Sequence, residues 1–197
     1  MSIPIYLPAA PGTCAYFDAD GSFFLPEGRA EILSLDDRNP LPPPSEELVR
    51  LLLRAKGQVG AAFLYFDVTG HTDLIGSLST LCPVIAPGAL CGETAAIPIF
   101  SYQPERETFS AFLASIPTRE CWLRLSPIDA VISYEDAGKE EQGEAYFSSL
   151  LQCNIKASHT ETSAVLTLFD TKETFQNRFR LLSPRFSGVI GDFNYFS

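Results

Sequence analysis

Apolar and polar positions alternate along the chain in blocks that fit strands and amphipathic helices in turn. After residue 44 the order helix then strand recurs, with short loops between the elements. The predicted helices cover residues 45–57, 72–81 and 104–116, and the predicted strands cover residues 60–68, 82–87, 95–102 and 121–126. Strands that alternate with helices are typical of a parallel sheet with crossover helices, so the sequence predicts an α/β fold.

The N-terminal part of the chain, residues 1–44, follows a different pattern. Short apolar pieces flank the turn sequence DADG and predict a hairpin-like element, and the stretch AEILSL predicts one short strand. The stretch DDRNPLPPPSEE holds four prolines and predicts an extended connector. We therefore expect one domain over residues 1–197, in which an irregular β-rich segment with its proline-rich connector (1–44) precedes a β/α part (45–197).

Residue types at the element ends place two helix starts. Ser45 is an N-cap with two glutamates in the first turn behind it, and Thr171 is the N-cap of a helix over residues 171–183. Strands are predicted on either side of that last helix, at residues 164–170 and 186–193. The stretch 135–153 starts acidic and becomes amphipathic, which favours a loop running into a helix and leaves an antiparallel excursion as the alternative.

Composition and charge exclude several classes of partner. The chain is 46% apolar and 19% charged, which is typical of a compact globular protein. Its net charge of -10 repels phosphate backbones and anionic lipid surfaces, so we expect no nucleic-acid and no membrane partner. No apolar run approaches the roughly 20 residues that span a bilayer, and no basic and apolar leader opens the chain, which predicts a cytoplasmic protein.

Cysteine and histidine limit the metal and nucleophile chemistry. The five cysteines form no C-x-x-C pair, and their number is odd, so buried free thiols are expected rather than a zinc site or a full disulfide set. With only two histidines, His71 and His159, a site built on several histidines is excluded. Because no phosphate loop, nucleophile elbow or metal motif is present, we expect neither a metal nor a cofactor.

Acidic and aromatic residues directly follow several of the apolar runs. The carboxyl ends of parallel strands meet on one rim, which is where α/β folds build their sites. Carboxylates that bind hydroxyl groups, beside aromatic rings that stack on sugar faces, suit a glycan. The predicted ligand-binding residues are Asp67, Tyr102, Tyr134, Glu135, Asp170 and Asp192.

Helix capping is the competing explanation for the acids. An aspartate between a strand and a helix often accepts hydrogen bonds from the free N–H groups at the helix start, and this role is favoured for Asp170, which is followed by TKET. Asp67 is the best single candidate for a site residue and the one candidate for catalysis, by hydrogen bonding or electrostatic stabilisation rather than proton donation. The charge-rich run after residue 134 is expected to be a solvated face rather than a metal cage.

The segment LTLFDTKETFQNRFRLLSPRFSGVIGDF resembles the closing β/α/β unit of the chitinase-like glycoside hydrolases of family 18. The resemblance implies an α/β barrel, in which AFLYFDVT takes the place of the family motif D-x-x-D-x-D-x-E on the fourth barrel strand. In this match Ala62 and Tyr65 replace the first two acids and Asp67 matches the third. Thr69 stands at the position of the catalytic glutamate, and Asp192 stands where the family has a tryptophan platform.

These differences shape the expected fold and function. A threonine hydroxyl does not usefully donate a proton near neutral pH, so the resemblance implies a barrel that lacks the family's general acid. A full barrel takes about 250 residues, which predicts an incomplete or irregular (β/α) TIM-like barrel here.

Three functions stay open on this basis. The leading one is a glycosidase-like barrel without hydrolase activity that binds a glycan or a protein at its rim. The second is an active glycoside hydrolase with rearranged carboxylates, and the third is a structural or interaction protein with no small-molecule site. The sequence predicts no oligomeric state.

Overall fold

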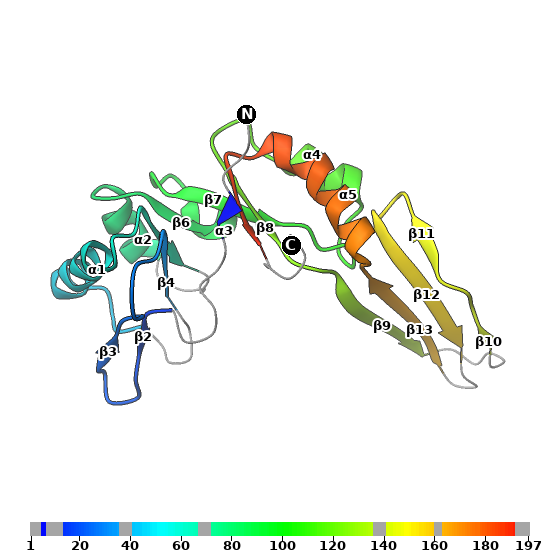
Figure 1. The fold of residues 1–197 in the computed structure, drawn as a ribbon, viewed down its shortest axis with the longest axis horizontal. Helices are drawn as coiled ribbons and strands as arrows, with labels where there is room; N and C mark the ends of the chain where they lie inside the picture. The colour runs from blue at the N-terminus through cyan, green and yellow to red at the C-terminus, as the bar shows by residue number, and fades with distance from the viewer. Residues whose placement is uncertain are drawn as a thin grey trace.

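A seven-stranded parallel sheet forms the main body of the protein. The computed structural model describes residues 5–6, 14–35, 41–66, 72–135, 141–159 and 163–191, with only the backbone at 5–6, 134–135 and 141–142. The strands follow the order β1-β14-β8-β7-β6-β5-β4 (Figure 1). Their bounds are β1 Ile5–Tyr6, β4 Ile32–Leu35, β5 Phe63–Phe66, β6 Val84–Pro87, β7 Ile97–Ser101, β8 Trp122–Leu125 and β14 Gly188–Gly191.

Helices connect most of these strands, as the alternating pattern predicts. They are α1 Glu46–Val59, α2 Thr72–Ser79, α3 Gly88–Cys91, α4 Phe109–Ser115 and α5 Lys172–Leu182, with a 3-10 turn, η1, at Ser183–Arg185. The Ser45 cap on α1 is confirmed by its hydrogen bond from Leu48 N–H, and the Thr171 cap on α5 is confirmed within a capping box. The helix α1 runs past the predicted end at residue 57 and stops at Gly60, whose left-handed φ of 70° a glycine adopts without strain.

The N-terminal segment adds a partial strand to the free edge of the sheet. Ala15 pairs with Leu35 in parallel, and its N–H donates to the Ser34 carbonyl at 2.9 Å. The predicted hairpin follows, with β2 (Tyr16–Phe17) antiparallel to β3 (Phe23–Phe24). In chain order the parallel members are β1, the segment at Ala15, β4 and β5. Strand β5 is therefore the fourth parallel member. No pairing joins β1 to the Ala15 segment in the part of the chain that the structure describes, so the barrel is incomplete, as predicted.

The concave face of the sheet carries its own small core. Inward-facing residues of neighbouring strands meet there: Ile32, Tyr65, Ile85, Ile99, Trp122 and Ile190. Trp122 is 2% exposed, and its ring contacts the Phe63 ring edge-to-face, with the ring centroids 4.9 Å apart. Gly188 of β14 is the register partner of Trp122, and a Cβ at that position would lie 2.6 Å from the indole. The glycine therefore makes room for the only tryptophan in the chain.

The opposite face of the sheet packs against the helices in two further cores. One core lies between β4, β5, β6 and the helices α1 and α2, and it includes Leu33, Leu64 and Leu52. The other lies between β8, α4 and α5, and it includes Leu123, Phe112 and Phe175. Both cores contain fully buried residues from the helices and from the strands. Hydrophobic burial therefore fixes the helices on the sheet.

A separate antiparallel sheet is inserted between β8 and α5. It is built from β9 Asp129–Glu135, β10 Glu141–Gln142, β11 Tyr146–Ser148, β12 Cys153–His159 and β13 Ser163–Phe169, in the order β10-β12-β13-β9 with β11 also on β12. Figure 1 shows it projecting from the end of the molecule opposite α1. The predicted helix within 135–153 is wrong in the described part of that stretch, and the antiparallel alternative is the observed one. The strand predicted at 164–170 forms, but in this sheet rather than in the barrel.

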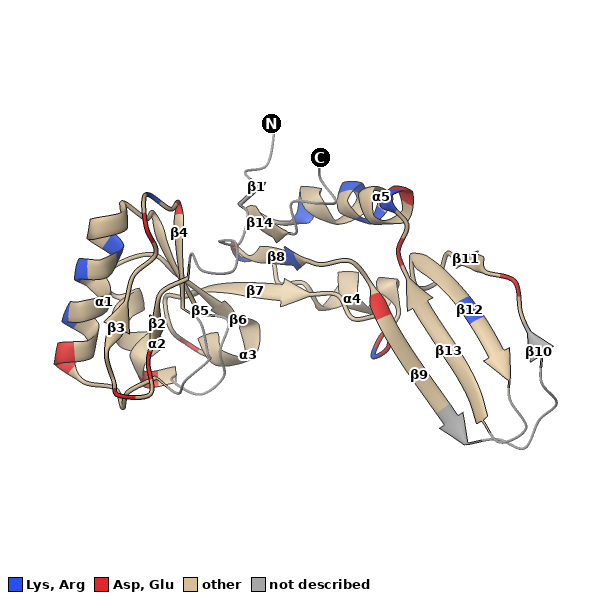
Figure 2. Cartoon of the chain, turned by 60° about the horizontal axis from the view of Figure 1, so that its bottom comes forward, with Lys and Arg blue, Asp and Glu red and all other residues tan. Residues whose placement is uncertain are grey.

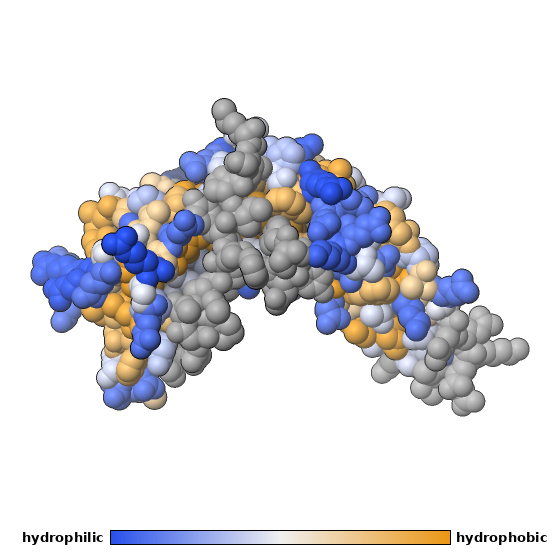
Figure 3. All heavy atoms as spheres, in the orientation of Figure 1, coloured by the Kyte–Doolittle hydropathy of each residue, from blue (hydrophilic) through white to orange (hydrophobic). Residues whose placement is uncertain are grey.

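Exposed apolar side chains gather on the inserted sheet. Figure 3 shows apolar surface over this part of the molecule, and the large exposed residues there are Val131, Tyr146, Phe147 and Leu150. The five cysteines form no disulfide, as predicted, and Cys91, Cys121 and Cys153 are buried. Cys14 and Cys82 are only partly buried, so the prediction of buried thiols is wrong for these two. Among the helices in the described ranges, none has the length and apolar character needed to cross a membrane.

Candidate functional site

The ends of β7 and β8 bring two polar side chains to the inner side of the rim. Ile99 and Trp122 are register partners inside the barrel, and side chains two residues further along a strand point to the same face. Ser101 and Arg124 occupy those positions, are again register partners, and are exposed. The apolar interior therefore gives way to a polar rim at the carboxyl ends of these strands.

A cavity of about 400 Å³ opens at this rim. Its walls come from the end of β7 with the loop behind it, and from the end of β8 with the link into β9. Figure 2 shows a basic position in β8 and an acidic one where β9 begins. The polar lining residues are Ser101, Gln103, Glu105, Arg124, Ser126 and Asp129. We call this cavity the rim pocket; it combines hydroxyl, amide, carboxylate and guanidinium groups, which can donate to and accept from the hydroxyl groups of one ligand.

Tyr102 lies in the wall of the rim pocket, but its hydroxyl group is used within the protein. The hydroxyl donates to the Leu151 carbonyl at 2.9 Å, and the ring packs against Phe109 and Phe112 at centroid distances of 5.4 and 5.3 Å. Burial is the main cause that raises the pKa of the Tyr102 phenol far above its usual value. The structure thus gives Tyr102 a role in holding the turn before β12.

We expect Tyr102→Phe to lower the free energy of unfolding by about 1 kcal/mol, because the Leu151 carbonyl loses its donor while the aromatic packing stays. Chemical denaturation of the two proteins measures this difference. Equal stability of the two proteins, together with weaker ligand binding by the variant, would instead assign the hydroxyl to a ligand.

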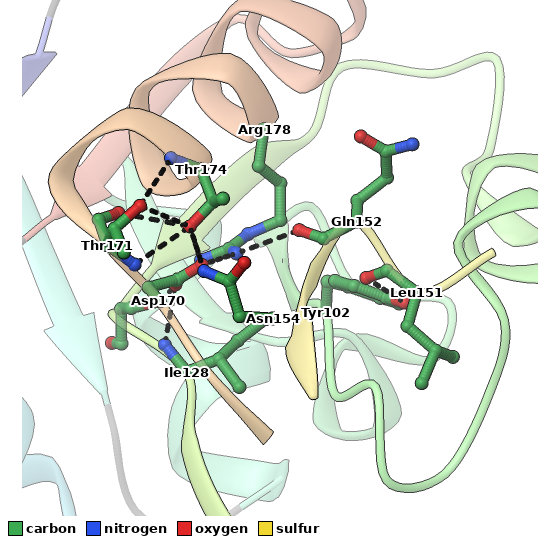
Figure 4. A network of polar contacts seen from close by, with 10 residues as sticks. Tyr102, Ile128, Leu151, Gln152, Asn154, Asp170, Thr171, Thr174 and Arg178 are labelled. Atoms are coloured by element: carbon green, nitrogen blue, oxygen red, sulfur yellow. Dashed lines mark hydrogen bonds and ion pairs between the residues drawn. The ribbon is translucent and has the colours of Figure 1, made fainter. Parts of the chain in front are cut away.

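Asp170 is fully engaged in a buried network (Figure 4). Its carboxylate forms a bidentate pair with Arg178, at 2.7 and 2.6 Å, and also accepts from the Thr174 hydroxyl and the Ile128 N–H. The two charged side chains are 0% and 1% exposed. The helix cap itself is Thr171, so Asp170 is not the helix cap that the sequence favours. A carboxylate with no exposed surface and four protein donors has no free position for a ligand, so the structure gives Asp170 a structural role.

Cys153 lies in the same core as Tyr102, and burial is the main cause that raises its pKa to about 11, with the Asp170 carboxylate adding to the shift. The unfolded thiol loses its proton near its ordinary pKa of 9.0, below the pKa of the folded thiol. The folded state therefore binds more protons in this range, and the stability contributed by the buried thiol falls as pH rises from about 9 to about 11.

We expect Cys153→Ala to flatten this alkaline loss of stability, measured by urea unfolding at several pH values between neutral and alkaline. The variant is compared with the wild-type protein at each pH, so that the cost of the smaller side chain cancels. A parallel decline of the two proteins over this range would contradict the assignment.

The remaining predicted site residues are placed only in part. Asp67 and Asp192 lie outside the described residues, and both stay predictions from the sequence. Tyr134 and Glu135 end strand β9 in the inserted sheet, where only their backbone is described. They pair with Ala164 and Ser163 of β13, so they belong to the antiparallel sheet rather than to the end of a parallel strand. Among the described residues, no three His, Cys, Asp or Glu side chains gather as a metal site would need.

Sequence reasoning did not identify most of the rim pocket. Arg124 carries the clearest signal, because it is the one charged residue within the apolar strand WLRL. Glu105 and Asp129 have no comparable signal, since one lies in a loop and the other begins a strand that the sequence did not assign to a second sheet. Only Tyr102, of the six predicted residues, is placed in the pocket wall among the described residues.

A second cavity, of about 460 Å³, lies on the outside of the barrel between α1 and α2. Val49, Leu53 and Leu81 line it with the ion pair Glu46–Arg50 at its edge. It lies on the helix layer and away from the strand ends, so it lacks the position at which barrels build their sites.

No protein-family model matches the sequence, and no curated protein sequence matches it. Solved structures match in fold. The spore cortex-lytic enzyme SleL of Bacillus cereus has a TM-score of 0.55 and 8% identity, over 96% of this chain and 70% of that chain. SleL of Bacillus megaterium QM B1551 has a TM-score of 0.49 and 9% identity, and the match covers 81% of this chain and 55% of that chain. A class V chitinase from Nicotiana tobaccum has a TM-score of 0.48 and 9% identity, and the match covers 84% of this chain and 76% of that chain.

The chain thus spans 55% of the length of the Bacillus megaterium enzyme. At 8% identity, the Bacillus cereus comparison shows the fold alone. That fold agrees with the α/β barrel that the sequence resemblance implies, and it extends over 96% of this chain. The protein has an incomplete α/β barrel, similar in fold to the spore cortex-lytic enzyme of Bacillus cereus.

Proposed function

We propose that this chain is a glycosidase-like barrel domain that binds a glycan in the rim pocket and does not hydrolyse it. The observation that carries the proposal is the rim pocket itself. It lies at the carboxyl ends of parallel strands, where barrel folds build their sites, and its lining offers several hydroxyl-binding groups.

The absence of hydrolysis is inferred from the sequence match on the fourth strand. The described strand β5 is the fourth member of the parallel array, which agrees with the position of the family motif. In the sequence, Thr69 then falls at the position of the catalytic glutamate. A hydroxyl of ordinary pKa cannot protonate the leaving oxygen, so the usual general acid is missing.

The test mixes the protein with N-acetylglucosamine oligomers or peptidoglycan fragments and records saturation transfer to the sugars by NMR. We expect saturation transfer from the wild-type protein and no new anomeric signals. Ser126→Phe, which adds a ring to the wall of the rim pocket, should reduce the transfer at least roughly tenfold through steric exclusion. Ser77→Phe is the matched control, because Ser77 is also an exposed serine but lines the outer cavity.

Loss of transfer with Ser77→Phe but not with Ser126→Phe would contradict the assignment to the rim pocket. The absence of transfer from the wild-type protein would favour an interaction protein with no binding site for these sugars.

Hydrolysis by rearranged carboxylates is the second candidate, because Glu105 and Asp129 line the same pocket. The usual two-carboxylate mechanism needs two carboxyl groups on either side of the scissile bond, about 5 to 9.5 Å apart. New anomeric signals that Glu105→Gln or Asp129→Asn abolishes would establish this candidate.

A further inference from the structure

One wall of the rim pocket is also the link between the barrel and the inserted sheet. The chain leaves β8 at Leu125, passes through Ser126, Pro127 and Ile128, and enters β9 at Asp129. Residues 126–130 all line the pocket. The position of this short link therefore sets both the shape of the pocket and the direction in which the inserted sheet starts.

The buried ion pair of Asp170 and Arg178 forms hydrogen bonds with the backbone of this link (Figure 4). Arg178 Nη2 donates to the Ser126 carbonyl at 3.1 Å, and the Asp170 carboxylate accepts from the Ile128 N–H at 2.8 Å. The Asp170 N–H donates in turn to the Ile128 carbonyl at 3.0 Å. Both backbone groups of Ile128 are thus bound to Asp170.

The pair also gathers the other chain segments at the base of the sheet. Arg178 projects from α5, and its Nη1 lies 3.5 Å from the Gln152 carbonyl, just before β12. Asp170 directly follows β13, and its carboxylate also accepts a hydrogen bond from the Thr174 hydroxyl on α5. The outgoing link, the returning strand and the turn before β12 are therefore connected to one helix through two side chains.

We infer that Asp170 and Arg178 are positioning residues for the rim pocket, which hold the wall at 126–130 in the shape that binds a ligand. A guanidinium fork against a carboxylate, with further hydrogen bonds to carbonyl and N–H groups, fixes direction as well as distance. The effect on glycan affinity rests on the proposed function, whereas the fixing of the wall does not.

The experiment compares the full chain with the double variant Asp170→Leu/Arg178→Met, which removes both charges together and leaves no unpaired charge in the core. Amide hydrogen exchange is followed residue by residue by NMR, and glycan affinity is measured on the same samples. Fluorescence of Trp122, the only tryptophan, reports whether the barrel interior stays intact. The control is Glu46→Gln/Arg50→Met, which removes an exposed pair on α1.

We expect exchange at the Ile128 amide to rise at least roughly tenfold more than at Leu64 in β5, because it loses a charged acceptor. Glycan affinity should fall by roughly the same factor, with unchanged Trp122 emission and no effect in the control. A folded double variant with unchanged Ile128 exchange, or with an equal increase at Ile128 and Leu64, would overturn the inference.

The inference stays testable if the double variant does not fold or if the wild-type protein binds no glycan. If the double variant loses its barrel, Arg178→Lys replaces it, since the lysine keeps a cation beside Asp170 but loses the fork and the Ser126 contact. It should raise Ile128 exchange relative to Leu64, and no rise would overturn the inference. If the wild-type protein binds no glycan, the proposed function fails, and Ile128 exchange alone decides whether the pair fixes the wall.

Discussion

Replacing Arg178 with methionine is expected to destabilise the folded chain by about 3–5 kcal/mol. The substitution leaves Asp170 buried at 0% exposure without its cationic partner, and the remaining donors, Thr174 and Ile128, do not neutralise a carboxylate. It also leaves the Ser126 carbonyl without its donor. Urea unfolding of the variant and the wild-type protein measures the loss.

The matched control is Arg50→Met, which breaks an ion pair whose side chains are 77% and 89% exposed. An exposed pair contributes at most about 1 kcal/mol, so this variant should unfold almost where the wild-type protein does. Equal losses at positions 178 and 50 would mean that the buried pair is not the stabilising feature that its geometry indicates.

Replacing Gly188 with alanine is expected to cost about 1–3 kcal/mol or more, because it overpacks the barrel interior. The added Cβ would lie 2.6 Å from Cε2 of Trp122 and 2.7 Å from Cδ2. The indole also contacts the Phe63 ring edge-to-face, so a shift of the indole would disturb that contact. The wavelength of Trp122 emission and the denaturation midpoint should both change.

Gly57→Ala provides a control of the opposite sign. Gly57 lies inside α1, and a Cβ there would meet nothing within 4 Å. Alanine is the better helix former by about 1 kcal/mol, so this variant should be more stable than the wild-type protein. If Gly188→Ala were tolerated as well as Gly57→Ala, the close packing of Trp122 against β14 would be wrong.

Local signals predicted most of the barrel. The caps at Ser45 and Thr171, and the alternating strands and helices between residues 45 and 126, follow from spacing and residue type alone. The inserted sheet could not be predicted in the same way. Its strand β13 pairs with β12, which directly precedes it, and with β9, which lies further back in the chain. A short apolar strand looks the same whether its partners are parallel or antiparallel.

The candidate site was predicted less well, for two physical reasons. Asp170 follows an apolar strand as a site acid would, but its partner Arg178 is eight residues away on a helix, and only the tertiary structure buries the two together. In the rim pocket, residues from two loops meet because β7 and β8 are neighbours. Of these residues Arg124 gives the clearest signal, because it is a charged residue inside an otherwise apolar strand.

The most direct test of the rim pocket as a glycan site is an NMR titration of the labelled protein with an N-acetylglucosamine oligomer, with chemical-shift changes assigned to residues. We expect the largest changes at residues 101–105, 124 and 126–130, which line the rim pocket. Changes confined to the outer cavity between α1 and α2, or no change at saturating sugar, would contradict it.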